Sequence, residues 1–213
     1  GHHVHACDFA EAMLAILDQR AAAENLSITS HLLAWDEDWS RAGLGENSVD
    51  CAFASRSLMS DHTLSRISKL DATARVKAAV VVPNSLPPSS DPRLLTYLGR
   101  KAKRPSTVPE VLRALRYLGR IPVTATTNTY RPMRFNSFNE ARADLRRLAR
   151  PEPFTAREQR LFDAYARDHF VEVPAVPPAN GLSNDHGDSP QTQWVLNYPL
   201  PVVWTFIGWR TDG

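Results

Sequence analysis

The sequence is poor in cysteine, with only Cys7 and Cys51 in 213 residues. Two cysteines cannot form the disulfide framework on which small secreted domains depend, so that class of protein is excluded. Both stand inside apolar stretches that we predict to be strands. We therefore expect two buried free thiols, as in proteins of a reducing compartment.

Long hydrophobic runs are also lacking. No apolar stretch approaches the roughly 20 residues that span a bilayer, and the N-terminus lacks the charged and then apolar pattern of a secretion signal. Together these absences predict a cytoplasmic protein with no membrane partner.

Neither sign of charge dominates the sequence. Lysine and arginine number 25 and aspartate and glutamate 23, for a formal net charge of +2. A charge this small favours no nucleic-acid partner for the molecule as a whole. A metal site is not expected either, because no cysteine or carboxylate stands at a spacing that completes a ligand set with His2, His3 and His5.

The first half of the chain alternates short strands with helices, the pattern of a parallel sheet covered by helices on both faces. A helix predicted over Ala10–Ala23 separates the first two strands, and Asp61 is the expected cap of a second helix. One strand, Val49–Ala54, is almost continuously apolar, which suits burial on both faces. The predicted strands are Val4–Cys7, Ile28–Ala34, Val49–Ala54 and Ala78–Val82.

The second half changes character. Three Ser/Thr-x-x-Glu sequences have the form of a capping box and predict helix starts at Thr107, Ser137 and Thr155. The chain from about Leu94 to Phe170 is therefore expected to be mostly helical, with one strand around Ile121–Thr126. A surface loop over Pro83–Asp91, a flexible loop over Pro174–Pro190 and a closing strand over Val202–Trp209 complete the prediction.

Ligands of a doubly wound sheet bind beyond the carboxyl ends of its strands, and three of these ends are distinctive. Asp8 follows the first strand, where a carboxylate accepts hydrogen bonds from both hydroxyls of a ribose, and Phe9 offers an apolar face to a nucleoside. The competing interpretation is that Asp8 only caps the helix beginning near Ala10.

The second strand is followed by Trp35–Trp39, which sets three carboxylates between two indoles. This arrangement suits an adenine, whose amino group donates a hydrogen bond and whose ring stacks. A solvated acidic turn with two packed tryptophans is the alternative. The third strand ends in Ala54–Ser57, where Arg56 either meets a ligand or pairs with Asp61 or Glu37.

In order and spacing these segments resemble class I S-adenosylmethionine-dependent methyltransferases. The run from Gly1 to Leu14 is similar to the second-strand segment of that family, in which a strand ends in an acidic residue and leads into a small-x-x-Met-Leu helix start. Trp35–Trp39 is similar to the acidic turn after the third strand, and Val49–Leu58 to the fourth strand. The resemblance covers about residues 1–85, and Trp204–Trp209 is similar to a last strand.

The resemblance implies S-adenosylmethionine as cofactor and a small-molecule methyl acceptor. It assigns the ribose hydroxyls to Asp8, the adenine to Phe9, Glu37, Asp38 and Trp39, and the methionyl part to Ser55 and Arg56. The family's Gly-x-Gly loop after its first strand is absent from this sequence. We therefore expect the chain to begin after that loop and to lack the strand that precedes it.

Catalytic and substrate residues are not singled out by the sequence. Asp61 and His62 are candidate bases for methyl transfer, although a histidine on a helix is more often a packing or surface residue. The segment Gly99–Arg120 holds seven basic residues and one acidic residue, Glu110. It forms either a patch for a phosphate-bearing substrate or RNA, or a solvated helix face, which we favour.

We expect a Rossmann-like α/β methyltransferase with three regions: a cofactor-binding core over 1–93, a helical substrate-binding region over 94–173, and a loop with a returning strand over 174–213. Two other hypotheses stay open. A nicotinamide-dependent oxidoreductase also uses an acidic residue after its second strand, and a non-enzymatic scaffold would explain the absent glycine loop.

Overall fold

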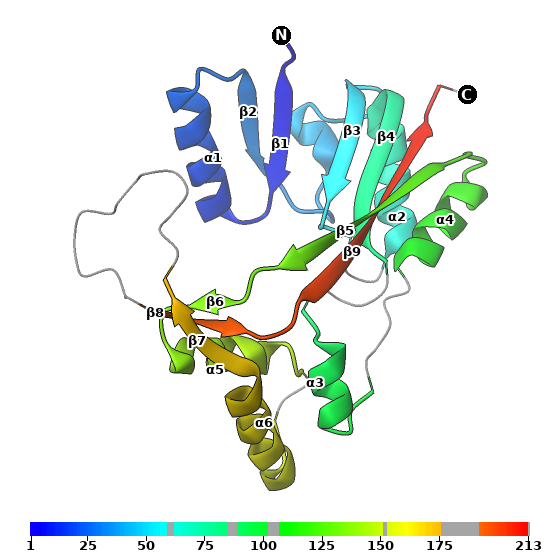
Figure 1. Cartoon of the computed structure of the whole chain (residues 1–213). Helices are drawn as coiled ribbons and strands as arrows, with labels where there is room; N and C mark the ends of the chain where they lie inside the picture. Colours follow the sequence, from blue (N-terminus) through cyan, green and yellow to red (C-terminus); the bar gives the residue numbers. More distant parts are fainter. Residues whose placement is uncertain (59–61, 85–88, 102–106, 151–152, 176–191, 213) are drawn as a thin grey trace. The chain divides into compact units, whose positions relative to one another are not determined.

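A computed structural model describes residues 1–58, 62–84, 89–101, 107–150, 153–175 and 192–212. Its first sheet pairs β1 (Val4–Asp8) with β2 (Ile28–Leu32) in parallel, in a register that runs from Val4 opposite Ile28 to Asp8 opposite Leu32. Helix α1 (Glu11–Ala23) joins the two strands (Figure 1). This β–α–β unit confirms the first strands and helix predicted from the sequence.

A second sheet has four strands in the order β3-β4-β9-β5. Helix α2 (Thr63–Thr73) connects β3 to β4, and the short 3-10 helix η1 (Trp39–Ala42) precedes β3. The predicted strands of this sheet are confirmed, although β4 and β5 are longer than expected. The strand bounds are β3 (Val49–Ser55), β4 (Ala74–Pro83), β5 (Val123–Arg131) and β9 (Leu200–Arg210).

Between Leu94 and Phe170 the described residues are mostly helical, as predicted, and a third sheet adds strands that were not predicted. Antiparallel strands in the order β6-β8-β7 join the helices of this region. The sequence did not reveal them, because β6 has only two residues and β8 pairs with a strand from a distant segment. The elements are β6 (Arg134–Phe135), β7 (Phe170–Pro174), β8 (Thr192–Leu196), α3 (Pro92–Tyr97), α4 (Thr107–Tyr117), α5 (Phe138–Arg147) and α6 (Ala156–His169).

The expected helix caps are observed where the structure describes them. The Ser137 hydroxyl accepts a hydrogen bond from the Glu140 amide, and Thr155 and Glu158 form a complete capping box. Helix α4 begins at the predicted Thr107. Asp61 and most of the predicted loop over Pro174–Pro190 lie outside the described residues, and α2 has His62 at its cap position.

The chain forms two compact units that interleave along the sequence. Unit 1 comprises 1–80, 110–123 and 207–213, and unit 2 comprises 81–109 and 124–206. Leu94, Leu145 and Phe162, all fully buried, lie in the apolar core of unit 2. The three functional regions expected from the sequence stay predictions, since a compact unit is defined by packing and not by role.

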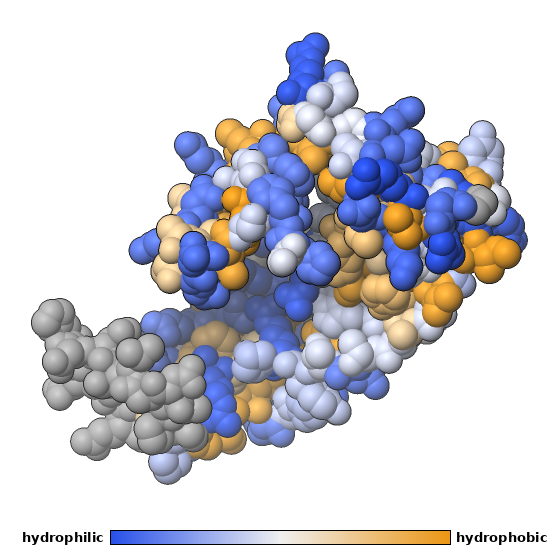
Figure 2. Space-filling view, turned by 90° about the horizontal axis from the view of Figure 1, so that it is seen from above, coloured by the Kyte–Doolittle hydropathy of each residue, from blue (hydrophilic) through white to orange (hydrophobic). Residues whose placement is uncertain are grey.

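Two expectations about burial were wrong. Cys7 and Cys51 are both exposed, and β3 is buried only at alternate residues, with Phe53 61% exposed between Ala52 and Ala54. The reason is that successive side chains point to opposite faces, and only the face of β3 that carries Ala52 and Ala54 is covered. β3 is also an edge strand: in the described sheets it pairs only with β4, as β1 pairs only with β2. Hydrophobic residues therefore reach the surface among hydrophilic ones (Figure 2).

None of the helices in the described ranges is long and apolar enough to cross a membrane.

Candidate functional site

The carboxyl end of the first sheet brings Asp8 next to the acidic turn. Asp8 is the register partner of Leu32, and its carbonyl accepts a hydrogen bond from the Leu33 amide at 2.9 Å. Because β1 and β2 are parallel, both strands end at this edge, and the Trp35–Trp39 turn follows within three residues. The structure thus unites two of the three strand ends that the sequence singled out.

Asp8 uses one carboxylate oxygen in the local turn. Its Oδ1 accepts a hydrogen bond from the Ala10 amide at 2.8 Å in the turn before α1, whose cap residue is Ala10 without a side-chain capping bond. Oδ2 has no hydrogen-bond partner among the described residues. The neighbouring Phe9 is 78% exposed. A half-buried carboxylate with one open oxygen, beside an exposed aromatic ring, fits the ribose and base of a nucleoside.

Lysine 69 of α2 holds the acidic turn in place. Its Nζ donates hydrogen bonds to the carbonyl oxygens of Trp35 at 2.6 Å and Glu37 at 2.8 Å, and it lies 5.1 Å from the centre of the Trp39 ring. The two indole rings lie 5.2 Å apart, and Trp39 Nε1 donates to the Ala34 carbonyl at 2.9 Å. The turn is therefore a rigid element of unit 1.

Two of the three carboxylates in this turn serve its own backbone. Glu37 Oε2 accepts a hydrogen bond from the Ala34 amide at 2.5 Å. Asp38 Oδ1 accepts from the hydroxyl and amide of Ser40 at 2.6 and 3.1 Å, and these bonds lower the pKa of Asp38. Asp36 is exposed and makes no hydrogen bond within the described ranges. It is the carboxylate most open to a ligand, and nothing in the sequence separated it from its two neighbours.

Arg66 adds an unusual polar group beside the turn. Its guanidinium carbon lies 5.6 Å from the centre of the Trp35 ring, and its Nε is buried without a hydrogen-bond partner in the described part of the chain. A buried N–H left unpaired costs about 1–3 kcal/mol. Arg66 was not predicted as a site residue, because its only signal in the sequence was its place on the predicted helix.

The third strand end lies in the other sheet of unit 1. Ser55 ends β3, and Arg56 follows with φ at +61°, a conformation that non-glycine residues rarely adopt. Such backbone strain is concentrated at functional sites. No described hydrogen bond connects Ser55 or Arg56 with Asp8 or the acidic turn, so their share in one site stays a prediction.

The structure describes only part of the remaining candidates. His62 occupies the cap position of α2 in a left-handed conformation, without a side-chain capping bond. In the basic segment, Arg100 pairs with Glu158 at 2.6 Å and Arg120 with Asp71 at 2.9 Å, which favours the interpretation as a structural surface. Lys103 and Arg104 lie outside the described residues.

A cluster of imidazoles covers one face of the first sheet. His5 Nδ1 lies 3.0 Å from Nε2 of His31, and His3 contacts the hydroxyls of Ser27 and Thr29. Burial first, and then the charges of His3 and His31, lower the pKa of His5. Over the described part of the chain, no group of three or more His, Cys, Asp or Glu side chains is arranged to hold a metal ion.

No protein-family profile matches the chain, and no curated protein sequence is detectably similar to it. Among solved structures it is similar to a provisionally named methyltransferase from Bacillus halodurans C-125, with 10% identity and a TM-score of 0.56 over 100% of this chain and 84% of that one.

It is also similar to a geranyl diphosphate methyltransferase solved with SAM, with 13% identity and a TM-score of 0.47 over 99% of this chain and 69% of that one. A provisionally named sarcosine dimethylglycine methyltransferase from Galdieria sulphuraria is also similar, with 10% identity and a TM-score of 0.48 over 99% of this chain and 70% of that one. The chain spans only 62% and 65% of two further geranyl diphosphate methyltransferase structures. At these identities the likeness defines the fold alone: the chain has the mixed α/β, Rossmann-like fold of methyltransferases.

Proposed function

We propose that this protein is an S-adenosylmethionine-dependent methyltransferase that acts on a small-molecule acceptor. The observation that carries the proposal is the carboxyl end of the first sheet, where Asp8 keeps one open oxygen beside the exposed ring of Phe9. The acidic turn that α2 fixes in place follows directly. These residues fit the adenosine half of the cofactor.

Each residue of this end has a distinct proposed role. Asp8 accepts hydrogen bonds from the ribose hydroxyls, and Phe9 packs against the adenine. Glu37, Asp38 and Trp39 shape the turn through their bonds to its backbone, while Asp36 accepts a hydrogen bond from the adenine amino group. Ser55 and Arg56 are proposed to lie near the methionyl part.

When bound, the cofactor supplies an electrophilic methyl group on a sulfonium. Transfer of that group depends mainly on alignment with the acceptor atom. No side chain is assigned as a base, because the geometry singles out none.

A nicotinamide-dependent oxidoreductase is the second candidate, because a carboxylate such as Asp8 also binds the ribose of a dinucleotide. The acidic turn between two tryptophans favours the methyltransferase. It provides an adenine contact that the oxidoreductase does not require.

Calorimetric titration of S-adenosylhomocysteine and NADH into the protein tests these proposals. We expect the thioether to bind, and Asp8→Ala to weaken its affinity by about tenfold or more through loss of a charge-assisted hydrogen bond. Asp8→Asn keeps an oxygen that can accept the hydrogen bond from the Ala10 amide, but it removes the negative charge. This variant therefore separates a loss of ribose binding from a loss of the local turn. Asp18→Ala is the matched control, since Asp18 contacts only Ser30 of β2 among the described side chains.

Preference for NADH would favour the oxidoreductase. Failure of the protein to bind the thioether would retire the methyltransferase and leave the scaffold hypothesis.

A further inference from the structure

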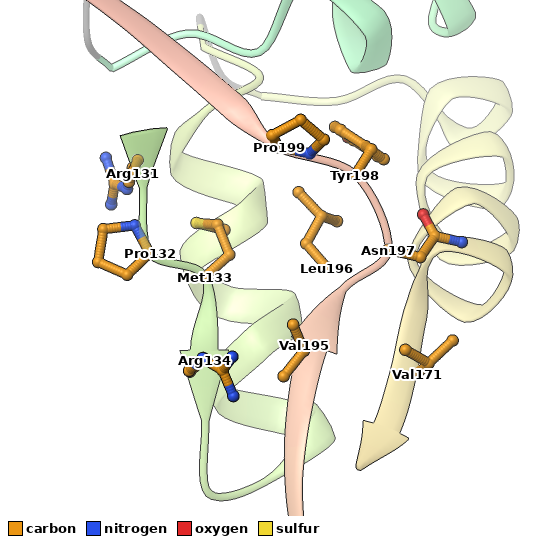
Figure 3. Close-up of a pocket in the computed structure, with 10 residues that line it drawn as sticks. All are labelled: Arg131, Pro132, Met133, Arg134, Val171, Val195, Leu196, Asn197, Tyr198 and Pro199. Carbon is orange, nitrogen blue, oxygen red and sulfur yellow. The ribbon is translucent and has the colours of Figure 1, made fainter. Parts of the chain in front are cut away.

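Unit 2 contains a hollow of about 400 Å³, and none of the proposed cofactor-binding residues lines it (Figure 3). Its walls are formed by the chain segments 131–134 and 195–199, with Val171 of β7 at one end. The volume falls in the range of small-molecule sites, roughly 300–1,000 Å³. All ten lining residues belong to unit 2.

The walls are mainly apolar and are held in register. Met133 and Leu196 are 4% and 5% exposed, and the Leu196 amide donates a hydrogen bond to the Met133 carbonyl at 3.2 Å. Arg134 is paired with Val195 across the β6–β8 ladder. The apolar lining residues are Pro132, Met133, Val171, Val195, Leu196 and Pro199. This surface suits the apolar body of a ligand.

The charge of the hollow is positive. Among the described residues, Arg131 and Arg134 line it, together with no aspartate or glutamate. Arg131 Nη2 lies 2.9 Å from Oδ2 of Asp144, but that carboxylate is 8% exposed and is shared with Arg147. One carboxylate thus faces two guanidinium groups, and a positive charge is left over.

Arg134 differs from Arg131 in this respect. In the described ranges, no carboxylate lies within ion-pair distance of its guanidinium, and the residue is exposed. With respect to that part of the chain, its guanidinium donors are open to a ligand. Guanidinium groups bind carboxylate and phosphate through two parallel hydrogen bonds, which makes an oxyanion the complementary charge.

The polar side chains of Asn197 and Tyr198, which also line the hollow, already make hydrogen bonds within the protein. The Tyr198 hydroxyl donates to the buried carboxylate of Asp91, and the Tyr165 hydroxyl lies 2.7 Å from it. Burial, and then the bond to Asp91, raise the pKa of Tyr198, so its hydroxyl keeps the proton. The side-chain amide of Asn197 donates a hydrogen bond to the Asp168 carbonyl at 3.3 Å. These groups shape the hollow, and the two arginines provide its charge.

From this combination we propose that the hollow binds a small molecule with an apolar body and one carboxylate or phosphate group, which Arg134 engages with support from Arg131. The apolar walls remove the body of the ligand from water, and the guanidinium pair fixes its orientation. The proposal does not depend on methyl transfer, since all of its residues lie in unit 2 and none belongs to the proposed cofactor site.

Calorimetry with 1-naphthyl phosphate, 1-naphthoate, 1-naphthol and inorganic phosphate tests the proposal. We expect at least one of the two naphthyl anions to bind about tenfold or more tightly than 1-naphthol, since a charge-assisted pair adds roughly that factor. Inorganic phosphate alone is expected not to bind. Comparison of the two anions then identifies the preferred oxyanion.

Variants locate the site. Arg134→Met should weaken anion binding about tenfold, and Val171→Glu, at a residue 41% exposed, should abolish it by placing a carboxylate in the hollow. Arg160→Met, at an exposed α6 residue outside the hollow, should have no effect. Equal affinities for 1-naphthol and both anions, or equal effects of Arg134→Met and Arg160→Met, would overturn the proposal.

Discussion

The guanidinium of Arg120 forms a two-bond ion pair with the carboxylate of Asp71, with Nε 2.9 Å from Oδ1 and Nη2 3.1 Å from Oδ2. The indole of Trp209 donates to the same Oδ1 at 2.8 Å. Asp71 and Arg120 are 13% and 19% exposed at their side chains. One carboxylate therefore joins the end of α2, the segment after α4 and the last strand.

We expect Asp71→Asn to lower the free energy of unfolding by about 2–4 kcal/mol, because it leaves a largely buried guanidinium without its counter-charge. Denaturant unfolding measures the change. Asp50→Asn is the control, since Asp50 pairs with Arg75 at 2.7 Å while 72% exposed, and its loss should cost less than about 1 kcal/mol. Equal costs for the two variants would contradict the assigned role of Asp71.

The buried hydroxyl of Tyr198 supports a second prediction. Tyr198→Phe leaves one oxygen of Asp91, a fully buried residue, without its donor, so the free energy of unfolding should fall by about 1–3 kcal/mol. Tyr165→Phe removes only the hydroxyl that bonds to Tyr198 and keeps the bond from Tyr198 to Asp91. The free energy of unfolding should therefore fall by less, about 1 kcal/mol. Thermal and denaturant unfolding compare the variants, and a larger loss for Tyr165→Phe would reverse this order.

Glu158 makes the stability of unit 2 depend on pH. The Arg100 side chain first, and then the amide and hydroxyl of Thr155, lower its pKa from 4.5 to about 2. A carboxyl with a depressed pKa in the folded state contributes stability above its unfolded pKa, and this contribution is lost as the pH falls through the folded value. The contribution is therefore complete above about pH 4.5 and disappears towards about pH 2.

The measurement is the difference in unfolding free energy between the protein and its Glu158→Gln variant. We expect this difference to shrink from about pH 7 to about pH 3. A Glu158→Gln difference independent of pH would show that its carboxylate is not stabilised by folding.

Two unpaired strand edges lead to a further prediction. In the described sheets β1 pairs only with β2, and β3 only with β4, while Met13, Ile16 and Phe53 are 57%, 50% and 61% exposed. We expect a strand added by design before Gly1 to pair with one of these edges, because an unpaired edge keeps backbone donors and acceptors for another strand. The extended protein should melt higher by several degrees, at about 2–4 °C per kcal/mol for a domain of this size.

A proline placed in the middle of the added strand provides the control, because it removes a ladder hydrogen bond. The gain in melting temperature should then shrink. Equal melting temperatures for the original and extended proteins would rule out the added strand.

Local patterns predicted much of the fold. The alternation of Val4–Cys7, the helix after Asp8 and the next strand identified the β–α–β unit, because period and punctuation are local properties of the chain. The capping sequences at Ser137 and Thr155 were equally reliable, since each cap is completed within four residues. Asp8 and the acidic turn were found because they follow strands.

Features that depend on distant segments were not predictable. The strand β8 exists through its pairing with β7, and the exposure of Cys51 and Phe53 depends on which face of β3 is covered. In the candidate site, the distinction among Asp36, Glu37 and Asp38 depends on backbone amides that the turn brings to two of them. Composition alone does not contain that information.

The interleaving of the two units has a consequence for synthesis of the protein. Unit 1 needs residues 207–213, and the bond from Trp209 to Asp71 closes a separation of 138 positions. At about 5–20 residues per second, translation from residue 80 to residue 207 takes on the order of ten seconds. During that time residues 1–80 lack the strand β9, so unit 1 completes its folding only after residues 207–213 have been made, and until then it is open to chaperones.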